Sequence, residues 1–97
     1  MILEIAILNV SVGNEAKFEA AFKEAEQYIK KMSGYISHEL LRSADSNNKY
    51  LLKVKWESLE DHTKGFRKSP EYQEWKKLLH HFYNPVPKVE YFEGKSI

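Results

Sequence analysis

The chain opens on a run of Ile, Leu and Val, and residues 2–11 are predicted to form a β-strand. Its alternate positions form two apolar faces, with Leu3, Ile5 and Ile7 on one and Ala6, Leu8 and Val10 on the other. A strand that is apolar on both faces has to be covered on both faces. The first element therefore predicts a packed layer on each side of the sheet that contains it.

Helical spacing of apolar residues follows over residues 15–32. Asn14 precedes this segment and is a favourable N-cap residue, and Ser33-Gly34 provides the stop. The segment is predicted to be one amphipathic helix, because its apolar residues recur every three or four positions. These residues are Phe18, Ala21, Phe22, Ala25, Ile29 and Met32.

Two further strands are predicted at residues 35–43 and 49–56, joined as a hairpin by the polar turn 44–48. In the second strand one face is strongly apolar and consists of Tyr50, Leu52, Val54 and Trp56. In the first strand, simple alternation puts Ile36, His38 and Leu40 on one face.

Two short helices and a closing strand complete the pattern. Ser58, with Asp61 three residues later, forms a variant capping box, and Ser69-Pro70 is a strong helix start. The second of these helices is predicted to end at the proline-rich segment 84–87, since proline cannot continue a helix. Residues 88–93 are predicted to form the last strand.

The order of elements predicts an α+β fold of the ferredoxin-like type, βαββ(αα)β, in a single domain spanning residues 1–97. This plan is a four-stranded antiparallel sheet with helices on one face. The opposite face is then bare, yet the first strand is apolar on that side as well. An exposed apolar face on so small a domain predicts a partner, and a symmetric homodimer packed sheet against sheet is the simplest cover.

Composition narrows the function classes. The 15 basic and 14 acidic residues nearly cancel, so no basic surface for nucleic acid is expected. There is no cysteine, which excludes disulfides, thiolate metal sites and a cysteine nucleophile and fits a cytoplasmic protein. The N-terminal residues have no positively charged region before the apolar run, and no apolar run is long enough to cross a membrane. A soluble protein that does not bind membranes is expected.

The sequence contains no recognisable metal or nucleophile motif. His38-Glu-Leu-Leu41 lies in a predicted strand and is therefore not half of a zincin helix. No His-x-x-x-His pair with an acid, Gly-x-Ser-x-Gly elbow or glycine-rich phosphate loop occurs. Neither a metal site nor a resident cofactor is expected.

Three segments carry a resemblance to a known family: Trp56-Glu-Ser-Leu-Glu-Asp-His62, Phe66-Arg-Lys-Ser-Pro-Glu-Tyr-Gln-Glu-Trp75 and His80-His-Phe-Tyr83. Together with the order of elements they resemble the antibiotic biosynthesis monooxygenase (ABM) family. The resemblance implies a dimeric α/β barrel that oxidises a small aromatic or quinol substrate with molecular oxygen. It also implies a substrate pocket between sheet and helices in each subunit, and several such enzymes need no metal, flavin or haem.

Candidate site residues follow from that resemblance and from side-chain chemistry. A histidine could take a phenolic proton from the substrate, since imidazole titrates near neutral pH, and the candidates are His62, His80 and His81. Actinorhodin-type oxygenases surround a phenolic substrate with Trp, Asn, Tyr and Arg. The expected substrate-binding residues here are Asn9, Trp56, Phe66, Arg67, Tyr72 and Trp75.

Each of these residues also has a structural interpretation. His80 and His81 could be protonated histidines that stabilise a helix C-terminus. His62 could be a partly exposed helix residue, Arg67 a solvated one, and His38 a hydrogen-bonded core or interface residue. Both tryptophans could be core residues that also form walls of a cavity.

The sequence therefore favours three candidate functions, in the following order. The first is a cofactor-independent monooxygenase for a small aromatic or quinone-like ligand. The second is a non-catalytic dimeric module that binds a small apolar ligand. Haem degradation is a distant third, because Gly65 and Lys76 fall near the places where that branch of the family has Trp and His, and Asn9 is offset from the expected Asn.

Overall fold

A computed structural model describes all 97 residues of the chain. The strands are β1 (Ile2–Asn9), β2 (Tyr35–Arg42), β3 (Lys49–Trp56) and β4 (Val89–Glu93). The α-helices are α1 (Glu15–Lys30) and α2 (Pro70–Leu79). A π-helix, η1 (Asp61–Phe66), precedes α2, and a 3-10 turn, η2 (His80–Phe82), follows it.

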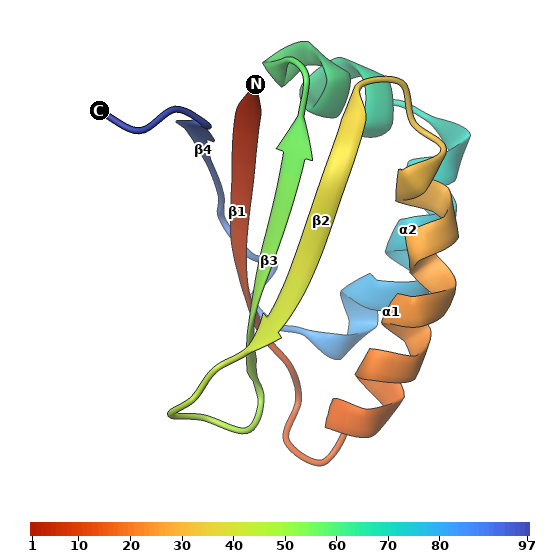
Figure 1. Ribbon diagram of the computed structural model, residues 1–97. Coiled ribbons are helices and arrows are strands. Elements are labelled where there is room, and N and C mark those ends of the chain that lie inside the picture. Colours follow the sequence, from red (N-terminus) through yellow and green to blue (C-terminus); the bar gives the residue numbers. More distant parts are fainter.

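The four strands form one antiparallel sheet in the order β2-β3-β1-β4, with every helix on the same side (Figure 1). The predicted ferredoxin-like α+β fold is therefore confirmed. β1 and β3 are the central strands, and they pair along their whole length, from Ile2 opposite Trp56 to Asn9 opposite Lys49. Since β1 also pairs with β4, the two ends of the chain meet at neighbouring strands.

The core lies between the sheet and the helices. Every second residue of β3 from Tyr50 to Trp56 is buried, as predicted from the alternation. The buried stripe of α1 is Phe18, Phe22, Ala25 and Ile29, and Trp75 and Leu79 of α2 pack into the same cluster. The helix-facing side of β1 contains one exception to the apolar pattern, which is the buried acid Glu4.

The ends of the helices follow the predicted signals in most places. Ser69 is the N-cap of α2, and its side chain accepts a hydrogen bond from the Tyr72 backbone N–H at 3.1 Å. Ser58 and Asp61 bond reciprocally, as the capping box predicts. Asn14 occupies the N-cap of α1, but its side chain makes no capping bond there, so that prediction was wrong in its chemistry. α2 ends at Leu79 rather than at the proline-rich segment, because the chain tightens into the 3-10 turn at His80.

A β-bulge in β2 changes which side chains share a face. The pairing of Tyr35 with Trp56 is followed by that of Ser37 with Lys55, so Ile36 is the extra residue. Tyr35 and His38 consequently lie on the helix side together. The predicted grouping of Ile36 with His38 and Leu40 was wrong for this reason, and Ile36 is 47% exposed.

The face of the sheet that no helix covers is partly apolar. Ile7, Leu41 and Phe92 are among the exposed large hydrophobic residues of the chain. They lie on the side opposite the core, with Leu3, Ile5 and Leu51 between them. None of the helices combines the length and the apolar composition needed to cross a membrane.

Candidate active site beneath the helices

A buried hydrogen-bonded cluster centres on Glu4 of β1. Trp56 donates its indole N–H to Glu4 Oε1 at 2.9 Å, and Glu4 Oε2 lies 3.3 Å from Nε2 of His62. The other ring nitrogen of His62, Nδ1, lies 2.6 Å from the Tyr91 hydroxyl on β4. Glu4 and His62 are only 6% and 3% exposed. The four side chains therefore form a continuous carboxyl–imidazole–phenol chain anchored by an indole.

Burial sets the protonation of this cluster. Removal from water raises the pKa of Glu4 to about 7, against the lowering effects of the Trp56 hydrogen bond and the Arg67 charge. Burial also lowers the pKa of His62 to about 4, and the positive charge of Arg67 lowers it further. Both directions favour the neutral forms, so between about pH 4 and pH 7 the pair is mainly a protonated carboxyl next to a neutral imidazole. It is not a buried ion pair.

This cluster borders a small cavity, termed the inner cavity, between the sheet and α2. Its volume is about 50 Å³, enough for a few water molecules. The walls are mostly aromatic and aliphatic, and the side chains with solvent exposure mark its open side. The lining residues are Glu4, Ala6, Leu8, Ile29, Leu52, His62, Phe66, Arg67, Tyr72, Trp75, His80, Tyr83, Pro87 and Val89.

Most of the residues predicted for a site meet at the inner cavity. Those that line it are His62, Phe66, Arg67, Tyr72, Trp75 and His80. Trp56 is fully buried behind it and reaches it through Glu4. Two residues lie apart. Asn9 is exposed on β1 opposite Lys49, on the side away from the helices, and His81 is exposed and stacks on Phe82.

The environment of two of these residues, His62 and His80, differs from one of their predicted interpretations. His62 is buried, so the interpretation as a partly exposed helix residue was wrong. Burial lowers the pKa of His80, which disfavours the protonated form that the helix C-terminus interpretation requires. Arg67 is largely exposed, yet it lines the cavity opening, where its charge lowers the pKa of Glu4. His38 is hydrogen-bonded to Tyr35, as its structural interpretation predicted.

Glu4 and Tyr91 were not among the predicted site residues. The sequence contained a signal for Glu4, because strict alternation places it on the same face as Ala6, Leu8 and Val10, which are all core residues. An acid at a core-facing strand position requires a buried partner. The partner itself, His62, lies 58 positions away, and only the folded chain brings the two together.

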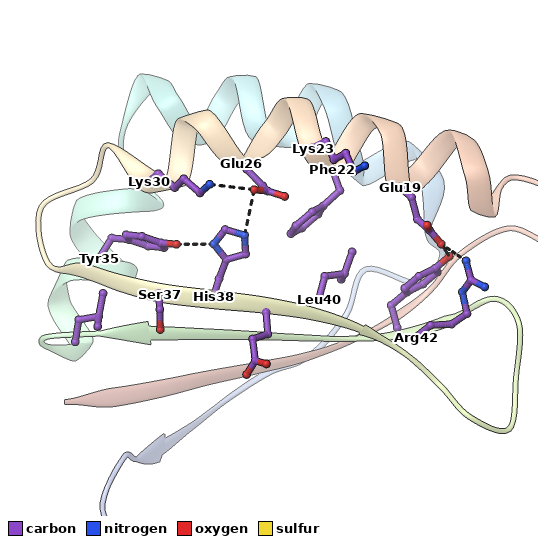
Figure 2. Close-up of a pocket in the computed structure, with 13 residues that line it drawn as sticks. Glu19, Phe22, Lys23, Glu26, Lys30, Tyr35, Ser37, His38, Leu40 and Arg42 are labelled. Carbon is purple, nitrogen blue, oxygen red and sulfur yellow. Dashed lines mark hydrogen bonds and ion pairs between the residues drawn. The ribbon is translucent and has the colours of Figure 1, made fainter.

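A second and larger space, termed the outer groove, lies between α1 and the edge strand β2 and has a volume of about 670 Å³. Figure 2 shows polar pairs at its two ends and an apolar middle. At one end the Tyr35 hydroxyl oxygen lies 2.6 Å from Nδ1 of His38. The other ring nitrogen of His38, Nε2, lies 3.7 Å from Oε2 of Glu26. At the other end Glu19 accepts hydrogen bonds from Tyr50 and Arg42. No pattern in the sequence predicted this groove.

No three His, Asp or Glu side chains are gathered in an arrangement that could hold a metal ion. The two carboxyl–imidazole pairs, Glu4 with His62 and Glu26 with His38, each lack a third ligand of that kind. Their second imidazole nitrogens face phenol hydroxyls instead, those of Tyr91 and Tyr35.

The Glu4–His62 pair predicts a specific dependence of stability on pH. Because the folded-state pKa of Glu4 is raised from 4.5 to about 7, its stabilising effect is complete below pH 4.5 and is lost as pH rises to about 7. The lowered pKa of His62 acts oppositely, with stability lost as pH falls from 6.5 to about 4. The two pH dependences of stability largely cancel in the wild-type chain. Replacing one of the two residues should make the pH dependence due to the other measurable.

We expect the Glu4→Gln chain to gain stability relative to wild type, by on the order of 3 kcal/mol, as pH rises from 4.5 to 7. Urea unfolding of both chains at several pH values measures the difference. Glu93→Gln, at an exposed acid of β4, is the matched control and should show a flat difference. A flat difference for Glu4→Gln as well would contradict the raised pKa.

Comparison with known proteins places these features in a family. The sequence model described as antibiotic biosynthesis monooxygenase matches residues 1–78. The chain is 54% identical over 93 residues to the uncharacterized protein YczJ of Bacillus subtilis (strain 168), covering 96% of this chain and 98% of that one.

Solved structures agree in fold. A Bordetella bronchiseptica protein that carries the same family name superposes with a TM-score of 0.92 at 35% identity, covering 99% of this chain and 97% of that chain. SnoaB from Streptomyces nogalater, described as a cofactor-independent oxygenase, has a TM-score of 0.84 at 19% identity, with 99% and 94% covered. At that lower identity, the likeness to SnoaB concerns the fold alone.

Proposed function

Because this chain belongs to the antibiotic biosynthesis monooxygenase family, we propose that it is a cofactor-independent monooxygenase acting on a small aromatic or quinol substrate. The observation that carries the proposal is the buried Glu4–His62 pair at the end of an aromatic-walled cavity. A carboxyl whose pKa lies at about 7 is well matched to proton abstraction at neutral pH. The description of SnoaB as a cofactor-independent oxygenase supports the reaction type.

In the proposed reaction the Glu4 carboxylate takes a proton from a phenol or from an activated ring CH₂. His62 and Tyr91 continue the hydrogen-bonded chain away from the cavity. The resulting anion gives one electron to oxygen, the substrate radical and superoxide combine into a carbon-bound peroxide anion, and the proton held by Glu4 returns to give the hydroperoxide. Loss of water then leaves a ketone, so that CH₂ and O₂ become C=O and H₂O. Arg67 at the opening would stabilise the negative charge that develops.

Substrate binding requires the inner cavity to open. A single benzene ring fits a cavity of about 150 Å³, larger than the empty space beside Glu4. The lining residues that are not fully buried are Arg67, Tyr72, His80, Pro87 and Val89, and these are the ones that would move. The His80 imidazole packs against the Tyr72 and Tyr83 rings and makes no hydrogen bond to another protein group, so its nitrogens are available to a substrate hydroxyl.

The proposal is tested by measuring oxygen uptake with a panel of anthrones and hydroquinones, with no metal or cofactor added. The expected result is uptake above the uncatalysed background, with one ketone or quinone formed per oxygen consumed for the anthrones. The exposed-residue variant His81→Gln should retain that rate. The absence of both oxygen uptake and substrate binding across the panel would overturn the proposal.

A non-catalytic ligand-binding module is the second candidate function. It is favoured by the size of the outer groove, about 670 Å³, which lies within the range of about 300–1,000 Å³ that small-molecule sites occupy. The two candidates differ in one measurable respect. A binding module would hold an aromatic ligand without consuming oxygen.

We also propose that the chain forms a homodimer through the uncovered face of the sheet. Ile7, Leu41 and Phe92 would be removed from water in such a dimer, and burial of apolar area drives association. Light scattering at micromolar concentration should give the mass of two chains. Ile7→Glu should shift the mass toward one chain, whereas Val12→Glu, at a residue 83% exposed outside the sheet, should not. A monomer mass for the wild-type chain would contradict the dimer.

A further inference from the structure

The outer groove has features of a binding site that is separate from the inner cavity. It is open along α1 and the edge strand β2, and its volume of about 670 Å³ suits a ligand of two or more rings. Figure 2 shows Lys23 and Phe22 together over its middle, with Leu40 on the opposite wall. We propose that this groove binds a small aromatic carboxylate, with the ring between Phe22 and Leu40 and the carboxylate on Lys23.

The charges of the groove indicate the sign of the ligand. Each acid that lines it already has a basic partner: Glu19 bonds Arg42, Glu26 lies 3.2 Å from Lys30, and Glu39 lies 3.7 Å from Lys53. Three acids and three bases line the groove, and Glu39 pairs with Lys53, which lies outside the lining. Lys23 is therefore the lining base left without an ion pair, and a carboxylate is the group that complements it.

The middle of the groove indicates the shape of the ligand. Phe22 is only 3% exposed and contributes a small part of its ring to the groove, next to His38, which it meets edge-on at 5.7 Å and 66° between the planes. Leu40 is partly buried against the core opposite. A flat ring fits between such walls because aromatic groups bury a large area without losing many rotatable bonds. The polar groups at the two ends satisfy one another, through Tyr35 with His38 and Tyr50 with Glu19. They close the ends of the groove and leave the middle to an apolar body.

Aromatic residues of the outer groove contact the tryptophans beside the inner cavity, so tryptophan fluorescence can report binding in the groove. Phe22 lies 5.6 Å from the Trp75 ring, which lines the inner cavity. Tyr35 lies 6.2 Å from Trp56, the donor to Glu4. A ring seated against Phe22 should therefore change the fluorescence of the tryptophans while leaving the Glu4–His62 pair intact.

The experiment uses 2-naphthoate as the probe and 2-naphthamide as its uncharged twin of the same shape. Tryptophan fluorescence and calorimetric titration are carried out on the wild-type chain, on Lys23→Glu and on Lys17→Glu. Lys17 lies on the same helix outside the groove and is the matched control, since both variants change the net charge equally.

We expect saturable one-to-one binding of 2-naphthoate to the wild-type chain at millimolar or lower concentration. Lys23→Glu should weaken it by about tenfold or more, since a charge-assisted hydrogen bond is lost and a repulsion is added. Lys17→Glu should change it by less than about twofold, because exposed charges that make no contact are largely screened. The naphthamide should bind about tenfold more weakly than the naphthoate.

Three results would overturn the inference. One is the absence of naphthoate binding at millimolar concentration. Another is equal weakening by the Lys23 and Lys17 variants, which would indicate a general charge effect. The third is equal affinity for naphthoate and naphthamide, which would mean that the site does not select a carboxylate. None of these results bears on oxygen uptake, so the monooxygenase proposal stands or falls separately.

Discussion

Replacing Glu4 by Gln is expected to lower the rate of oxygen uptake by about 10²–10⁴-fold, the usual contribution of a general base. The amide keeps the geometry of the site, because its oxygen can still accept from Trp56 and its NH₂ can donate to Nε2 of His62. What it loses is the ability to take up a proton. The loss should appear in kcat with little change in KM, since the substrate is bound by the aromatic walls.

The pH–rate profile separates this role from a structural one. In the wild-type chain the rate should rise with pH through about 7, because the carboxylate is the active form and burial raises its pKa to that value. In Glu4→Gln the residual rate should lack that rise. His81→Gln serves as the control for both readouts, as His81 is exposed outside the cavity. A Glu4→Gln chain with the rate and profile of wild type would exclude Glu4 as the base.

The second large effect is expected at Trp56, whose side chain is fully buried. Trp56→Ala should destabilise the fold by about 3–5 kcal/mol, since it leaves a large cavity and removes the donor to Glu4. Trp56→Phe isolates the donor, because the ring is kept and only the N–H is lost. That change should cost about 1–3 kcal/mol. The cost should be greater at pH 8 than at pH 5, because a charged carboxylate suffers most from a missing hydrogen bond.

Trp75→Phe is the matched control for Trp56→Phe. Trp75 is also buried, at 5% exposure, but its indole N–H donates to no protein acceptor. The change at Trp75 should therefore show a cost that does not vary with pH. Urea unfolding at the two pH values measures all three variants. Equal pH dependence for Trp56→Phe and Trp75→Phe would show that the Trp56–Glu4 bond has no energetic role.

The fold was predictable because its signals are local. The alternation in β3, the helical stripe of α1 and the Ser69-Pro70 start each depend on residues close in sequence, and each appears as predicted. The errors occurred where a signal required geometry. The capping ability of Asn14 does not ensure a capping bond, and the bulge at Ile36 leaves no trace in a simple alternation of polar and apolar residues.

The site was less predictable for a different reason. Its side chains come from β1, α1, β3, η1, α2, η2 and β4, so their convergence is a property of the folded chain alone. Residue chemistry suggested His62 as a candidate base, and the resemblance suggested the aromatic residues as substrate-binding candidates, but neither predicted that His62 lies beside Glu4. The outer groove was missed because it depends on how far α1 stands from β2, a distance that no sequence pattern encodes.

The bulge in β2 has a consequence for changing this protein by design. Tyr35 and His38 face the same side because β2 carries one residue more than the strand it pairs with, so with Ile36 present the Tyr35–His38 contact depends on the bulge as well as on two side chains. Deleting Ile36 would place Tyr35 two positions before His38, where regular alternation keeps both side chains on the helix side, so the contact should survive without the bulge. If the strand instead kept Ile36 and paired without the bulge, Tyr35 would turn to the other face of the sheet and the contact would be lost.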